Sequence, residues 1–177
     1  MRAVNDPKGE ALYMSGYMQQ TISLLKQGKS QDLPIAAILV NPKTKQVLLT
    51  AHDTRISTKH PLNHAIMLLL RQLPSLLPSR MDSANTTSNK DDTQYYANMY
   101  DVYTTHEPCQ MCCMALVHSR IRRLIFWKGM DTGAKALGWM KGDDTELLNH
   151  RYMCFEGIPG ALSEDAELED LGSQVYV

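Results

Sequence analysis

The sequence predicts an α/β domain in which one sheet is covered by helices on both faces. Three features support this fold class: short apolar runs of strand length, amphipathic stretches of helix length, and the alternation of the two along the chain. The chain has 177 residues, the size of one ordinary domain, and hydrophobic residues make up 44% of it. We therefore expect residues 1–177 to form a single domain with its own core.

The first part of the chain is predicted to form a helix followed by a β-hairpin. Apolar residues recur every three or four positions over residues 7–29, and Gly28 suits the end of such a helix. Residues 35–40 and 47–51 are short apolar runs, and an Asn-Pro-Lys turn sequence separates them. The hairpin is expected over residues 34–52.

A second helix is predicted over residues 61–73, with Pro61 at its start and Pro74 near its end. Residues 74–98 then change character, because they include a long polar stretch with almost nothing to bury. We expect this segment to be a mobile loop inserted within the domain, since recognisable elements resume after it.

The second half of the chain is predicted to contain a strand, a helix and two further strands. These elements are expected, in order, over residues 100–104, 108–117, 124–127 and 152–155, with Pro108 as the first residue of the helix. Residues 129–149 carry four glycines and are expected to be mostly loop. Residues 158–177 are expected to be an acidic C-terminal tail.

Charge and cysteine usage exclude several classes of protein. Lys plus Arg number 18 and Asp plus Glu number 19, so the chain has no global positive field and a nucleic-acid role needs a local patch or a partner. No apolar run approaches the ~20 residues of a membrane span, and no signal peptide is recognised. Three of the four cysteines fall within five positions, which does not suit a disulfide scaffold and predicts a reducing compartment.

Cys109 and Cys112 form the most informative motif, Pro-Cys-x-x-Cys. Two cysteines three positions apart at a helix start can face the same side of the first turn, where the helix dipole favours thiolates. A tetrahedral zinc ion needs further ligands, and His64 near the start of the preceding helix is the leading candidate. A redox-active cysteine pair and buried packing cysteines remain the alternatives.

The order of the motifs makes the resemblance to a known family specific. The His-containing segment 60–66 (HPLNHAI) precedes Glu-Pro-Cys-Gln-Met-Cys at 107–112, and residues 115–121 and 148–151 add to the match. The chain resembles the cytidine/deoxycytidylate deaminase superfamily in its tRNA adenosine deaminase branch, and in particular the non-catalytic subunit of the eukaryotic heterodimeric enzyme that forms inosine at the wobble position. The match runs from about residue 34 to 157.

The resemblance implies a cytidine-deaminase-like three-layer sandwich, with a mixed five-stranded sheet and helices on both faces. It implies Zn²⁺ held by His64, Cys109 and Cys112. It also implies a heterodimer with a catalytic deaminase subunit, contact with the anticodon arm of tRNA, and a nuclear and cytoplasmic location. The fourth zinc ligand stays open between water and a protein group such as the terminal carboxylate of Val177.

Two departures from active relatives predict a silent site with no catalytic residue of its own. Ile66 stands where active members carry the glutamate that shuttles protons, and its side chain cannot accept or donate one. Asp53 stands near the position of a substrate-contacting Asn, where an acid is expected to repel phosphate. Glu107 is the carboxylate to consider as a substitute, but we expect it to act in a turn or a partner contact.

Basic residues that follow the predicted zinc helix are candidates for nucleic-acid binding. The cluster consists of Arg120, Arg122, Arg123 and Lys128. The alternative is a solvated basic face beside a strand.

We thus expect a catalytically silent, zinc-binding subunit of a tRNA adenosine deaminase, inactive alone and needed for assembly and tRNA positioning. One alternative is a self-sufficient zinc-dependent deaminase of nucleosides, nucleotides or RNA with an unusual proton shuttle. Another is a zinc-stabilised interaction module that makes no RNA contact.

Overall fold

The computed structural model of the chain describes residues 7–27, 31–76, 97–131, 133 and 150–157. Most of the expected insertion loop (74–98), most of the expected glycine-containing loop (129–149), and the expected acidic tail (158–177) with Val177 lie outside these residues. The expected elements from residue 7 to residue 157 can therefore be compared with the structure, and those three expectations remain predictions.

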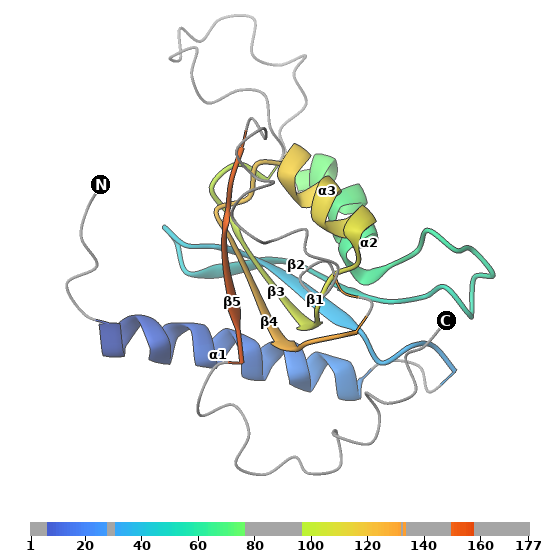
Figure 1. Ribbon diagram of the computed structural model, residues 1–177, viewed down its shortest axis with the longest axis horizontal. Coiled ribbons are helices and arrows are strands. Elements are labelled where there is room, and N and C mark those ends of the chain that lie inside the picture. Colours follow the sequence, from blue (N-terminus) through green and yellow to red (C-terminus); the bar gives the residue numbers. More distant parts are fainter. Residues whose placement is uncertain (1–6, 28–30, 77–96, 132, 134–149, 158–177) are drawn as a thin grey trace, which may run out of the picture.

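A mixed five-stranded sheet forms the centre of the fold, as the resemblance implied (Figure 1). Its strands lie in the order β2-β1-β3-β4-β5; β1 pairs antiparallel with β2 and β3, whereas β3, β4 and β5 are parallel. The bounds are β1 Ala36–Asn41, β2 Gln46–His52, β3 Asp101–His106, β4 Arg123–Lys128 and β5 Met153–Glu156. The β1–β2 pair is the predicted hairpin.

Helices cover both faces of this sheet. Helix α1 (Pro7–Lys26) lies along one face, while α2 (Ala65–Gln72) and α3 (Gln110–His118) lie together on the other (Figure 1). A 3₁₀ turn, η1 (Leu73–Leu76), continues α2. Among the described residues, no helix is both long and apolar enough to cross a membrane.

The two faces of β1 show why its sequence is apolar without alternation. Ala37 and Leu39 join the core beneath α2 and α3, whereas Ile38 and Val40 join the core beneath α1. A strand that is buried on both faces favours apolar side chains at every position, because a polar one would need a buried partner. The continuous apolar run therefore belongs to a central strand of a three-layer domain.

Both helices on the second face begin later than predicted. Helix α2 begins at Ala65, not at Pro61, and α3 begins at Gln110, not at Pro108. Residues 54–63 instead make their own turn, in which the Thr54 amide donates to the Asn63 carbonyl. Those turn bonds use backbone groups that an additional helical turn would need, and the shift makes His64 and Cys109 the N-cap residues.

A buried ion-pair network joins the start of β3 to the start of β4 and to α1. Asp101 accepts hydrogen bonds from Nε (2.8 Å) and Nη2 (2.8 Å) of Arg122, and from Nη2 of Arg123 (2.7 Å). Arg123 also contacts Glu10 of α1. Arg123 is only 3% exposed and Asp101 is fully buried, so each charge depends on the other for its compensation.

We expect Asp101→Asn to lower the free energy of unfolding by about 3 kcal/mol, because it leaves the buried Arg123 guanidinium poorly compensated. Urea denaturation of the two proteins measures the change. Lys43→Gln, which removes an exposed charge, is the matched control and should change stability by less than about 0.5 kcal/mol. Equal effects of the two substitutions would contradict a stabilising role for the network.

Candidate metal centre and its pocket

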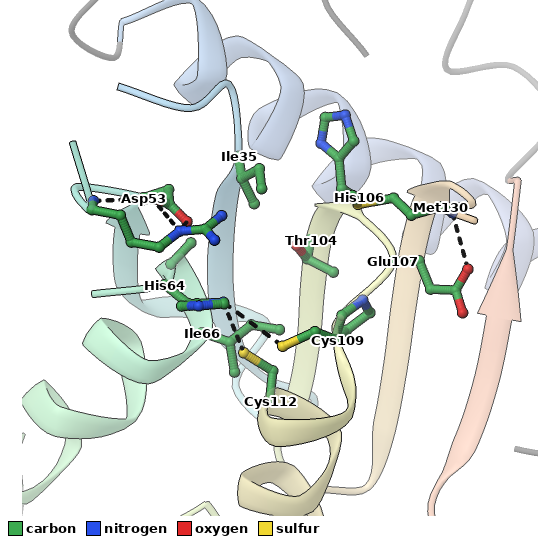
Figure 2. A pocket seen from close by; sticks show the side chains of 13 residues that line it. Ile35, Asp53, His64, Ile66, Thr104, His106, Glu107, Cys109, Cys112 and Met130 are labelled. Carbon is green, nitrogen blue, oxygen red and sulfur yellow. Dashed lines mark hydrogen bonds and ion pairs between the residues drawn. The ribbon is translucent and has the colours of Figure 1, made fainter. Parts of the chain in front are cut away.

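The first turns of α2 and α3 bring three metal-ligating side chains together. His64 is the N-cap of α2, Cys109 is the N-cap of α3, and Cys112 lies in the first turn of α3. Neither N-cap side chain makes a capping hydrogen bond to its own helix, so both are available to a shared ligand. Figure 2 shows the imidazole facing the two sulfurs. The predicted trio therefore forms one cluster.

The distances suit a tetrahedral zinc ion. The Nδ1 atom of His64 lies 3.8 Å from Sγ of Cys109 and 3.6 Å from Sγ of Cys112, and all three atoms lie within 4.8 Å of one another. An ion at ordinary Zn–S and Zn–N bond lengths would hold nitrogen and sulfur about 3.6 Å apart. The donor set of one imidazole and two thiols is also the one that zinc prefers, so the residues fit the ion.

The cluster already favours a thiolate. A hydrogen bond from Cys112 lowers the pKa of Cys109 to about 4, against the effect of burial and with help from His64. The same shared proton, together with burial, raises the pKa of Cys112. One sulfur is thus a thiolate at neutral pH, which is the form that coordinates metal.

A cavity of about 400 Å³ opens beside the trio. Its lining includes Ile35, Ile66, Thr104, Pro108 and Met130 as well as the three ligating residues. Ile66, which follows His64 by two positions on α2, is 3% exposed and lies next to the ligating atoms (Figure 2). At the place where a proton shuttle would have to stand, the cavity wall is hydrocarbon.

Glu107 lines the cavity, but its carboxylate is turned away from the trio. It accepts a hydrogen bond from the backbone N–H of Met130 at 3.1 Å (Figure 2). A Cβ atom at Gly133 would lie 2.2 Å from Cδ of Glu107, so a side chain there would require the carboxylate to move. The acid thus holds the backbone that follows β4, which agrees with a turn role and not with proton transfer at the metal.

Asp53 does not present the repulsive charge that the sequence led us to expect. It is fully buried, and Nε of Arg55 lies 3.1 and 3.0 Å from its two carboxylate oxygens. The backbone N–H of Arg55 also donates to it at 3.1 Å. Arg55 lines the cavity and was missed by sequence reasoning; its position two residues after an acid was the available signal.

His106 is the second cavity residue that sequence reasoning missed. It is 3% exposed, its Nδ1 atom lies 3.1 Å from Oγ1 of Thr105, and its Nε2 atom is buried without a hydrogen-bond partner among the described residues. Burial, assisted by the positive charge of Lys128, lowers the pKa of His106 to about 4. The ring is therefore neutral at pH 7.

The four basic residues proposed for nucleic-acid binding do not form one surface. Arg123 is buried in its ion pairs, and the idea that it contacts a phosphate is wrong for that reason. Arg122 is 30% exposed but bound to Asp101. Lys128 lies at the opposite end of β4 from Arg123, about 16 Å along the strand. Arg120 precedes β4 and adopts a left-handed backbone conformation, with φ 57°.

The fold and the pocket define the class of protein. A mixed sheet that carries a His/Cys/Cys cluster at two helix N-termini is the arrangement of a zinc-dependent deaminase domain, here with isoleucine in place of the acid. Residues 14–128 match the family model described as the cytidine and deoxycytidylate deaminase zinc-binding region. A solved chain from studies of A-to-I editing by tRNA:A34 deaminases shares the fold, with a TM-score of 0.60, 20% identity, and coverage of 81% of this chain and 98% of that one.

Two curated relatives are similar to this chain over most of its length. The chain is 33% identical over 170 residues to a Danio rerio protein named "Probable inactive tRNA-specific adenosine deaminase-like protein 3", and 34% identical over 143 residues to the tRNA-specific adenosine deaminase subunit TAD3 of Saccharomyces cerevisiae. These matches cover 86% and 78% of this chain but 49% and 42% of the relatives, so the chain spans about half their length. The chain belongs to the cytidine and deoxycytidylate deaminase family. Within it, the chain is similar to the two named relatives over most of its own length.

We expect His64→Ala to reduce bound zinc from about one ion per chain to well below half, because two sulfurs alone make an incomplete site. Plasma mass spectrometry on the dialysed protein measures the zinc content. His60→Ala is the matched control, since His60 is exposed and lies outside the cluster. Full zinc content in the His64 variant would contradict the assignment of this ligand.

We also expect a pH dependence from His106. Its pKa is lower in the folded chain than in the unfolded chain, so the unfolded state takes up a proton first as the pH falls below about 6.5. Stability should therefore drop between pH 6.5 and about 4, by at most about 3 kcal/mol. In chemical denaturation at several pH values, His106→Leu should remove this part of the slope, while His118→Leu, on an exposed helix end, should not.

Proposed function

We propose that the chain is the catalytically silent, zinc-binding subunit of a tRNA adenosine deaminase, working beside a related subunit that retains the glutamate. One observation carries the proposal: the complete His64, Cys109 and Cys112 cluster is kept beside a buried Ile66. The names of the curated relatives, which call them deaminase subunits or inactive deaminase-like proteins, point the same way.

The residues that line the pocket explain why we expect no deaminase activity at this site. Bound zinc would act as a Lewis acid and would link the first turns of α2 and α3 through shared ligands. Deamination also needs a group that moves a proton between water and the base, and Ile66 cannot do so. The two carboxylates at the cavity are engaged elsewhere, Asp53 with Arg55 and Glu107 with the amide of Met130.

The partner surface is proposed on α2 and α3. Their outer sides carry half-buried apolar residues that extend the core toward the surface, namely Met67, Leu68, Leu70, Met111 and Met114. Flexible methionine and leucine side chains at a partly exposed helix pair suit a packed protein interface. Strand β4 offers no open edge to a partner, because β3 and β5 flank it on either side.

Binding of tRNA is proposed to be shared with the partner. The formal net charge of −1 gives this chain no global attraction for RNA. Arg120 and Lys128 remain the candidates from the original cluster. Because they stand at opposite ends of β4, they would contact separate parts of the RNA backbone.

The deciding experiment measures inosine formation in a tRNA with a wobble adenosine. We expect no turnover by this chain alone, little by the catalytic subunit alone, and robust turnover by the two together. Turnover by this chain alone would contradict the silent-subunit proposal and favour a self-sufficient deaminase. If the two proteins together form no inosine, with zinc confirmed in both, the result would favour an interaction module without an editing role.

Two variants sharpen that experiment. Ile66→Val keeps the apolar wall and should leave turnover by the mixture within about twofold. His64→Ala should lower turnover together with the amount of complex recovered by gel filtration. Without the zinc link, α2 and α3 are no longer held together where the partner is proposed to pack. A His64 variant that forms the complex normally yet lowers turnover at least tenfold would instead place chemistry at this metal.

A further inference from the structure

Arg55 is held in one orientation at the cavity by a buried acid. Its Nε atom contacts both carboxylate oxygens of Asp53, at 3.1 and 3.0 Å, and Asp53 is fully buried. The Arg55 side chain is itself only 19% exposed. A guanidinium fixed through Nε loses little further side-chain freedom when a ligand binds, so the site is preorganised.

The Nη1–Nη2 edge of this guanidinium has no protein partner. Within the described ranges, the hydrogen bonds of the Arg55 side chain run from Nε alone. Arg55 lines the same cavity as the metal-ligating trio. Two parallel N–H donors on one edge match the two oxygens of a carboxylate or a phosphate.

The acids and the second histidine that line the cavity leave room for an anion, and bound zinc would neutralise the thiolate of Cys109. Asp53 is neutralised by Arg55 itself, and the carboxylate of Glu107 is bonded to the amide of Met130 on the far side. His106 lines the cavity as a neutral ring. The volume of about 400 Å³ accommodates a small organic anion.

We propose that this cavity is an oxyanion-binding site in which the Nη1–Nη2 edge of Arg55 receives a carboxylate or phosphate group. The ligand class is a small oxyanion or a molecule that carries one. The inference does not depend on the proposed role in tRNA editing, and its failure would leave that role intact.

The test is calorimetric titration of the full chain with inorganic phosphate and, separately, with acetate, at constant ionic strength in a chloride buffer. We expect saturable binding of at least one anion with a dissociation constant in the millimolar range, the strength of one charge-assisted bidentate contact. The preferred anion then shows whether the natural ligand carries phosphate or carboxylate.

Two variants locate the bound anion. Arg55→Lys keeps the positive charge but removes the two parallel N–H donors of the Nη1–Nη2 edge, and should weaken anion binding about tenfold. Because a single change can leave Asp53 buried and poorly compensated, the double variant Asp53→Asn/Arg55→Gln removes the charged pair together and should abolish binding. Arg71→Gln, on the exposed side of α2, is the control and should bind as the native chain does.

Each outcome bears on the site directly. The proposal is supported if saturable anion binding is lost in the Asp53→Asn/Arg55→Gln variant and kept in the Arg71→Gln variant. Lack of saturable binding to either anion overturns it. Equal binding by the native chain and the double variant also overturns it, because the anion would then sit on the metal or elsewhere on the surface.

Discussion

The burial of β3 on both edges and both faces is the constraint on which the rest of the structure depends. This strand pairs antiparallel with β1 and parallel with β4, and every residue of it is buried. A charge at either of its ends must therefore be compensated inside the protein. Asp101 at its start is compensated by two arginines, and the residues that follow its end, from Glu107 to Cys109, turn directly into the metal cluster.

The parallel pairing of β3 and β4 explains where the cluster lies. A parallel pair needs a crossover, and α3 is that crossover, so its N-terminus must stand at the carboxyl end of β3. The hairpin does the same for α2, because β2 ends at the same edge of the sheet and a short turn leads to His64. Two helix starts thus meet at one place for topological reasons, before any metal binds.

Much of this arrangement was predictable from the sequence, and the parts that were not have physical reasons. Strand-length apolar runs located all five strands, and motif spacing with the family resemblance brought His64 to the two cysteines. The start of α2 was missed because the turn bonds of residues 54–63 override the preference for proline at a first helical position. The role of Arg123 was missed because a basic residue beside a strand looks the same in sequence whether it faces solvent or an acid 22 positions away. Arg55 was missed because its one signal, an acid two positions earlier, does not reveal that a turn folds the two side chains together.

The contact between Glu107 and Gly133 has a consequence for how this sequence can diverge. The carboxylate fills the space that any side chain at position 133 would occupy. A substitution at the glycine would force Glu107 off the amide of Met130, and a shorter residue at 107 would leave that amide unpaired and a void above the glycine. The two positions are therefore expected to be coupled among proteins with this domain, and covariation between them would mark the geometry of this loop.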